Sequence, residues 1–103
     1  MTLREKQSLF ASLIPKLILY IYEQGYEVTL GDAYAKDGHS KNSKHYDRLA
    51  MDLNLFLHGE YLTSTDDHRF AGIHWKTLHS ECTWGGDFRR EDGNHYSLGE
   101  HND

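Results

Sequence analysis

The sequence predicts one α+β domain. Three features of its 103 residues indicate this class: a long amphipathic helix at the start, a β-hairpin near the middle, and a shorter helix after the hairpin. A chain of this length can form one modest hydrophobic core. We therefore treat residues 1–103 as a single domain, with a polar tail at 99–103 that is expected to lie outside the core.

The first helix is predicted from about Thr2 to Gln24. Thr2 and Glu5 match a capping box, and Gly25 matches the glycine that often ends a helix. Pro15 lies inside this stretch and should kink the helix or restart it, because proline lacks the N–H that the helix needs. The apolar side chains recur at spacings of three, four and seven, which places them on one stripe: Leu3, Phe10, Leu13, Ile14, Leu17, Ile18 and Ile21.

Alternating residues predict the strands. Tyr26, Val28 and Leu30 alternate with polar residues, as in a strand with one buried face. An apolar run at 49–57 is followed by His58-Gly59, which favours a turn into a partner strand at 60–62.

The rest of the chain predicts one helix and one strand. The helix is expected over 67–79, with Thr65 or Asp66 as its N-cap. A short strand is expected over 83–88, where a Gly-Gly pair indicates a bulge or a close approach of backbone or ligand.

Charge and composition exclude several partners. The formal net charge is -5, which disfavours nucleic acid and acidic membrane surfaces because both bind mainly through Lys and Arg. The apolar stretch at 9–22 is too short and interrupted for membrane insertion, and it does not suit a signal peptide. We therefore expect synthesis in the cytoplasm. Cys82 is the only cysteine, so no intramolecular disulfide can form, and we expect a packing thiol.

Asp52 is the first candidate for chemistry, because it lies in an otherwise apolar strand. A buried carboxylate is costly unless it is paired or binds a metal. Ala50 shares its strand face and leaves room for an ion, while His45 and His95 offer imidazoles from two loops. Three N/O ligands with a fourth position left to water are typical of catalytic zinc. The prediction is Zn²⁺ held by His45, Asp52 and His95.

Asp92 precedes His95 by three residues, so both side chains can point into one cleft. A carboxylate beside a metal-bound water can act as general base, which is the role we assign to Asp92. Asp92-Gly93-Asn94 is equally an ordinary turn, and a histidine taken alone is more often structural than a ligand. The other histidines are most simply surface residues: His39, His58, His68, His74, His79 and His101.

Two sequence blocks resemble a known family. Ser43-x-His45-x-x-Arg48-x-Ala50-x-Asp52 resembles the S-x-H-x-x-G-x-A-x-D signature of the zinc D-Ala-D-Ala metallopeptidase family. The second block begins with Trp84 and continues Gly-Gly-Asp-Phe, then Asp92-x-x-His95-Tyr96. It is similar to the W-G-G-D-W/F … D-x-x-H-F run of the phage endolysins in that family. The resemblance covers about residues 25–98.

This resemblance implies helices packed on a small antiparallel sheet, of the hedgehog and D,D-peptidase type. It implies zinc on the three predicted ligands, Asp92 as base, and the peptide stem of bacterial peptidoglycan as substrate. The expected protein is a monomeric phage or prophage endolysin with L-Ala-D-Glu endopeptidase activity, which reaches the cell wall once a partner protein has opened the membrane. Ser43, Arg48 and Trp84 are expected to contact the substrate.

Two departures from the family keep alternatives open. Arg48 replaces the glycine of the signature, and Ala35 stands where the family usually has a substrate-binding arginine, for which Arg48 is the first replacement candidate. A D-Ala-D-Ala carboxypeptidase is the near alternative. A catalytically weak, zinc-containing cell-wall binding module is the second. A structural domain without metal is disfavoured, because it would bury Asp52 with no ion.

Overall fold

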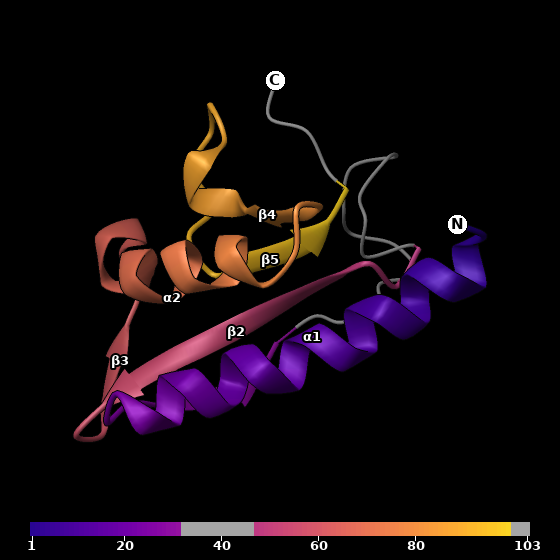
Figure 1. Ribbon diagram of the computed structural model, residues 1–103. Coiled ribbons are helices and arrows are strands. Elements are labelled where there is room, and N and C mark those ends of the chain that lie inside the picture. Colours follow the sequence, from indigo (N-terminus) through magenta and orange to yellow (C-terminus); the bar gives the residue numbers. More distant parts are fainter. Residues whose placement is uncertain (32–46, 100–103) are drawn as a thin grey trace.

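The computed structural model describes residues 1–31 and 47–99 of the chain (Figure 1). Two helices pack on one small antiparallel sheet, so the predicted α+β class is confirmed. In chain order the elements are α1 (Leu3–Glu23), β1 (Glu27–Leu30), β2 (Ala50–Leu57), β3 (Glu60–Leu62), α2 (Thr65–Leu78), β4 (Cys82–Trp84), a 3₁₀ turn (Gly85–Asp87) and β5 (His95–Leu98).

Strand β2 organises the sheet. The strands lie in the order β1-β2-β5-β4, and β3 also pairs with β2. On the side away from β1, residues 55–57 of β2 pair with β3 and residues 50–52 pair with β5. Figure 1 shows β3 and β5 near opposite ends of this long strand. Strand β2 therefore connects the hairpin to the C-terminal strands.

One face of the sheet carries the core. Leu49, Leu53 and Leu55 from β2 and its approach are buried against residues of both helices. Because side chains alternate along a strand, Ala50 and Asp52 lie on the opposite face. The core otherwise consists of Phe10, Leu13, Ile14, Leu17, Ile21, Ala71, Trp75, Cys82, Trp84, Tyr96 and Leu98. Asp52 is thus carried on the face that points away from the helices.

Helix α1 begins as predicted. The Thr2 hydroxyl accepts from the Glu5 N–H at 3.1 Å, while the Thr2 N–H donates to the Glu5 carboxylate at 2.8 Å. Gly25 follows the helix with φ +92°, the left-handed conformation that glycine favours. The helix continues through Pro15 without a restart. The expectation that Leu3 belongs to the buried stripe is wrong, because this residue of the first turn is 50% exposed.

The hairpin is confirmed. Leu57 pairs with Glu60, which leaves a two-residue turn with φ 50° at His58 and φ 80° at Gly59. Two positive φ values are typical of the type I′ turn, whose twist matches that of the strands. The predicted buried face of β1 fails at Leu30, which is 63% exposed at the end of this strand.

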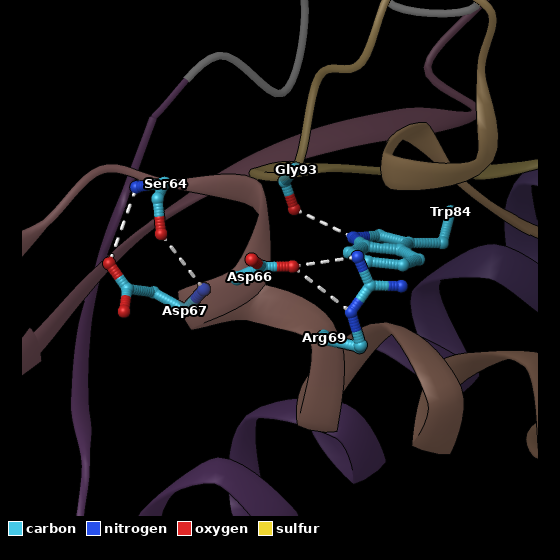
Figure 2. Close-up of polar contacts among 6 residues, drawn as sticks. All are labelled: Ser64, Asp66, Asp67, Arg69, Trp84 and Gly93. Carbon is cyan, nitrogen blue, oxygen red and sulfur yellow. Dashed lines mark hydrogen bonds and ion pairs between the residues drawn. The ribbon is translucent and has the colours of Figure 1, made fainter.

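The second half of the chain departs further from prediction. Ser64, rather than Thr65 or Asp66, caps α2, and Asp67 completes a capping box with it (Figure 2). The strand expected over 83–88 ends at Trp84, because the Gly-Gly pair turns into a 3₁₀ helix. Strand β5 was not expected, and His95 begins this strand instead of lying in a loop. In the described ranges, neither helix has the length and apolarity needed to cross a membrane.

Candidate metal centre

Asp52 and His95 face each other across the pairing of β2 with β5. Their Cα atoms are register partners, so both side chains project from the same sheet face. Asp52 Oδ1 is buried and lies 3.4 Å from His95 Nδ1. The sheet therefore holds a carboxylate and an imidazole together at positions that its backbone hydrogen bonds fix.

Asp92 joins them from the turn that precedes β5. Its N–H donates to the Gly85 carbonyl at 2.9 Å, and its carbonyl accepts from the His95 N–H at 3.1 Å. Its Oδ2 lies 3.9 Å from His95 Nδ1, and its side chain is 53% exposed. Asp92 thus places a solvent-accessible carboxylate at the rim of a largely buried pair.

These three residues could hold a metal ion. One ligand atom from each lies within 4.8 Å of the other two. Bonds of about 2.0–2.2 Å in a tetrahedral zinc site place two ligand atoms about 3.3 Å apart. The 3.4 Å between Asp52 and His95 fits this spacing, whereas Asp92 lies slightly farther from the histidine. The geometry is therefore consistent with Asp92 either as a third ligand or as a neighbouring base.

Glycine at position 85 permits this arrangement. A Cβ there would overlap the Asp92 carbonyl and lie 2.8 Å from the His95 Cβ. The ring of Phe88 forms a wall beside His95, with 5.5 Å between the ring centroids. The sequence prediction of a close backbone approach at the Gly-Gly pair is confirmed here.

Five positions named by the sequence analysis lie outside the described residues. They are His45, the third predicted ligand; Ser43, a predicted substrate contact; Ala35, where the resemblance leads us to expect an arginine; and His39 and His101, two predicted surface residues. Of the predicted metal ligands, the structure brings together Asp52 and His95, with Asp92 beside them. His45 stays a prediction.

Arg48 has an unusual backbone. Its φ is 58°, in the left-handed region that L-residues other than glycine rarely adopt. Glycine would adopt this conformation without the steric cost of a Cβ. Arg48 lines a hollow of about 530 Å³ between β2 and α1, together with Gln7, Phe10, Ala11, Ile14, Pro15 and Met51. Met51 alternates with Asp52, so this hollow lies on the helix side of the sheet, and the substrate contact of Arg48 stays a prediction.

Trp84 is 1% exposed, so its side chain presents almost no surface to a substrate. Its indole N–H donates instead to the carbonyl of Gly93 at 2.7 Å (Figure 2). Trp84 therefore contacts the loop that carries Asp92. The predicted substrate contact stays untested.

His68 corrects the view that the remaining histidines are surface residues. It is 2% exposed, and its Nδ1 lies 2.8 Å from the hydroxyl of Tyr96. Burial lowers the pKa of His68. A signal was present in the sequence, because His68, Ala71, Gly72 and Trp75 share one helical stripe.

Cys82 is buried, as expected of a packing thiol, and burial raises its pKa to about 11. A thiol with so high a pKa is a poor nucleophile and metal ligand near neutral pH. Cys82 is therefore part of the core rather than of the site.

The comparisons with known proteins identify no relative: no family model matches the chain, and no curated protein matches it.

Proposed function

We propose that the protein is a zinc metallopeptidase that cleaves the peptide stem of bacterial peptidoglycan. The favoured activity is that of a phage or prophage endolysin with L-Ala-D-Glu endopeptidase specificity. One observation carries the proposal. Asp52 belongs to the first sequence block and Asp92 and His95 to the second, yet their ligand atoms lie within 4.8 Å of one another.

The donor set suits zinc. Asp52 offers a carboxylate oxygen and His95 an imidazole nitrogen at a separation that one tetrahedral ion can span. His45 is the proposed third ligand, on the strength of the family resemblance. Oxygen and nitrogen donors also accept other divalent ions, so metal identity needs its own measurement. When bound, zinc supplies two effects, a lower pKa for its water and polarisation of the scissile carbonyl.

The protein residues divide the remaining work. Asp52 and His95 would hold the ion from paired strands, which keep their separation fixed. Asp92 lies beside His95 and is open to solvent, so it can take a proton from the attacking water and return it to the leaving amine. Proton transfer by one positioned carboxylate supports hydrolysis of an amide bond.

The substrate side of the proposal rests on the resemblance. A stem peptide carries carboxylates that require a cation, and Ala35 provides none. Arg48 is the first candidate to replace the missing group, with Ser43 as a further predicted contact. We propose a monomer that is made in the cytoplasm and acts on the wall after the membrane has been opened.

Mass analysis of digested peptidoglycan tests the activity. Purified sacculi are incubated with zinc-loaded protein, with chelator-treated protein and with Asp92→Asn. Endopeptidase action at L-Ala-D-Glu produces fragments with a new D-Glu amino terminus, which should be absent from both controls. Release of free D-Ala alone would instead identify a D-Ala-D-Ala carboxypeptidase.

Two observations favour a second function. Asp92 Oδ2 is close enough to His95 to become a further ligand of the same ion, and Ala35 stands where the resemblance leads us to expect a substrate-binding arginine. With Asp92 as a further ligand, the ion would have no open position for the attacking water. Such a site would bind zinc without hydrolysis and serve as a cell-wall binding module. Zinc-dependent binding to sacculi with no new termini would support this alternative and contradict the peptidase.

A further inference from the structure

We infer that Trp84 is a positioning residue, which holds the loop at 92–94 and thereby sets the places of Asp92 and His95. The inference rests on the metal site proposed above and assigns a role to an indole that is buried beside it. Figure 2 shows this indole directed at the Gly93 carbonyl.

The hydrogen bond is a side-chain link between β4 and the loop at 92–94, beside the backbone bond from the Asp92 N–H to the Gly85 carbonyl. Trp84 is the last residue of β4, and its N–H donates to Gly93 at 2.7 Å in a buried environment. Gly93 also packs against the start of α2, where a Cβ would lie 2.6 Å from the Thr65 Cα. The indole and the first turn of α2 therefore hold the loop in addition to its backbone bonds to Gly85 and Leu53.

The same loop carries the site. Gly93 directly follows Asp92, whose carbonyl accepts from the His95 N–H. Asn94 follows Gly93, and its carbonyl accepts from the N–H of Leu53 at 2.9 Å. Leu53 is the next residue after Asp52 in β2. A shift of the Gly93 carbonyl would therefore move the Asp92 carboxylate and disturb the first pairing of β5 with β2.

The indole is itself held in one place. Gly72 of α2 and Gly86 approach its ring so closely that neither position has space for a Cβ. Two cations lie over the ring, with the Arg69 guanidinium 5.5 Å and the Lys76 ammonium 5.7 Å from the centroid. Such cations are attracted to the face of an indole.

Each of these cations is paired with a carboxylate. Figure 2 shows the pair of Asp66 and Arg69, whose charged atoms are 2.8 Å apart, and Asp87 lies 2.6 Å from Lys76. The indole therefore has one position, and its N–H has one direction. A fixed donor of this kind can orient the backbone that carries a metal ligand, which is the usual role of groups behind a metal site.

The test compares Trp84→Phe with a matched control, Trp75→Phe. Trp75 is also a buried indole, and it donates to the carbonyls of Thr83 and Ser97 at 3.0 and 3.1 Å. Ser97 is held by strand pairing on both sides, whereas Gly93 lies in a loop. The control thus loses a similar hydrogen bond without releasing the loop.

Three quantities are measured on the full chain: zinc affinity by chelator competition, the visible spectrum of the cobalt-substituted protein, and the urea midpoint. Both variants should have a lower urea midpoint than the wild-type protein. Only Trp84→Phe should lose zinc affinity, by about 10–100-fold, the usual cost of removing a group that orients a ligand, and only it should change the cobalt spectrum. Equal zinc affinities and cobalt spectra in the two variants would overturn the inference.

A second substitution covers the case in which Trp84→Phe does not fold. Benzothienylalanine keeps the shape of the indole and replaces its N–H by sulfur. In a Trp75→Phe background the analogue enters only at position 84, and zinc affinity should again fall. Unchanged affinity overturns the positioning role. A wild-type chain that binds zinc without cutting peptidoglycan contradicts the peptidase alone, whereas a chain that binds no zinc contradicts both proposals.

Discussion

Two polar pairs on neighbouring residues of β5 can be compared directly. His95 lies 3.4 Å from Asp52 on one face of the sheet, and Tyr96 lies 2.8 Å from His68 on the other. Each pair joins a histidine to an oxygen from a distant element. Strand alternation alone sends one pair to the face that points away from the helices and the other to the core.

The pairs differ in what surrounds them. Helix α2 and the core enclose His68 and Tyr96, and burial lowers the pKa of the histidine and raises that of the tyrosine. His95 and Asp52 instead border Asp92, which is 53% exposed. The buried contact between His68 and Tyr96 therefore serves the packing of the core. The neighbouring, accessible carboxylate of Asp92 gives the His95–Asp52 pair a third group with which it could hold a metal ion.

Metal addition should give the largest difference between the His95–Asp52 pair and the His68–Tyr96 pair, because only the first is proposed to bind zinc. Zinc at a thousandfold excess over its dissociation constant should raise the free energy of unfolding by about 4 kcal/mol, since it binds only the folded chain. Asp52→Ala should abolish this gain, because it removes a ligand. Thermal melts with zinc and with a chelator measure both. A melting temperature that does not respond to zinc in the wild-type protein would contradict the metal site.

Tyr96→Phe should affect stability without affecting the metal. It removes the hydroxyl beside His68 and leaves a buried imidazole nitrogen unsatisfied, at a cost of about 1–3 kcal/mol. Urea unfolding of the chelator-treated protein measures this cost, and a zinc titration supplies the control. Loss of zinc binding in Tyr96→Phe would mean that the two faces of β5 are not independent.

Acid should destabilise the wild-type protein through His68. Because the pKa of His68 is lowered in the folded state, the unfolded chain takes up its proton first as the pH falls below about 6.5. Stability from this group is present above that pH and is lost as the pH falls toward the folded pKa. The free energies of unfolding of metal-free wild type and His68→Gln, measured over a range of pH, should converge as the pH falls. A difference between them that does not change with pH would contradict the assignment.

Arg48→Gly should stabilise the chain by about 1 kcal/mol, because glycine adopts φ 58° without the steric cost of a Cβ. Arg48→Ala is the matched control, since it removes the guanidinium and keeps the Cβ. Melting temperatures of the two variants separate backbone strain from side-chain contacts. Arg48→Gly should melt above Arg48→Ala, and the reverse order would rule out strain at this position.

Local signals predicted the first half of the fold. The Thr2–Glu5 capping box located the start of α1, and His58-Gly59 located the hairpin turn, because both depend on residues close in sequence. Strand β5 escaped prediction. It has four residues, all buried, and forms only through pairing with β2 and β4 on either side. A buried strand this short has no alternation to reveal it.

The sequence pointed to Asp52, Asp92 and His95 as candidates, but it did not give the strand register that brings them together. The cost of burying Asp52 indicated a partner, and the spacing of Asp92 and His95 indicated one cleft. That Asp52 and His95 would be opposite each other depends on a pairing between segments forty residues apart. The buried role of Trp84 was likewise hidden, because a tryptophan in a motif is compatible with a substrate wall and with a core.

The most direct test of the metal centre compares zinc content and turnover in Asp92→Asn and His95→Ala. Asp92→Asn keeps the shape of the side chain and removes the proton acceptor. It should therefore retain zinc and lose activity by about 10²–10⁴-fold. His95→Ala deletes a ligand and should lose zinc and activity together. If Asp92→Asn loses zinc as readily as His95→Ala, Asp92 is a ligand; if it retains full peptidase activity, the general base lies elsewhere, and either result contradicts the account.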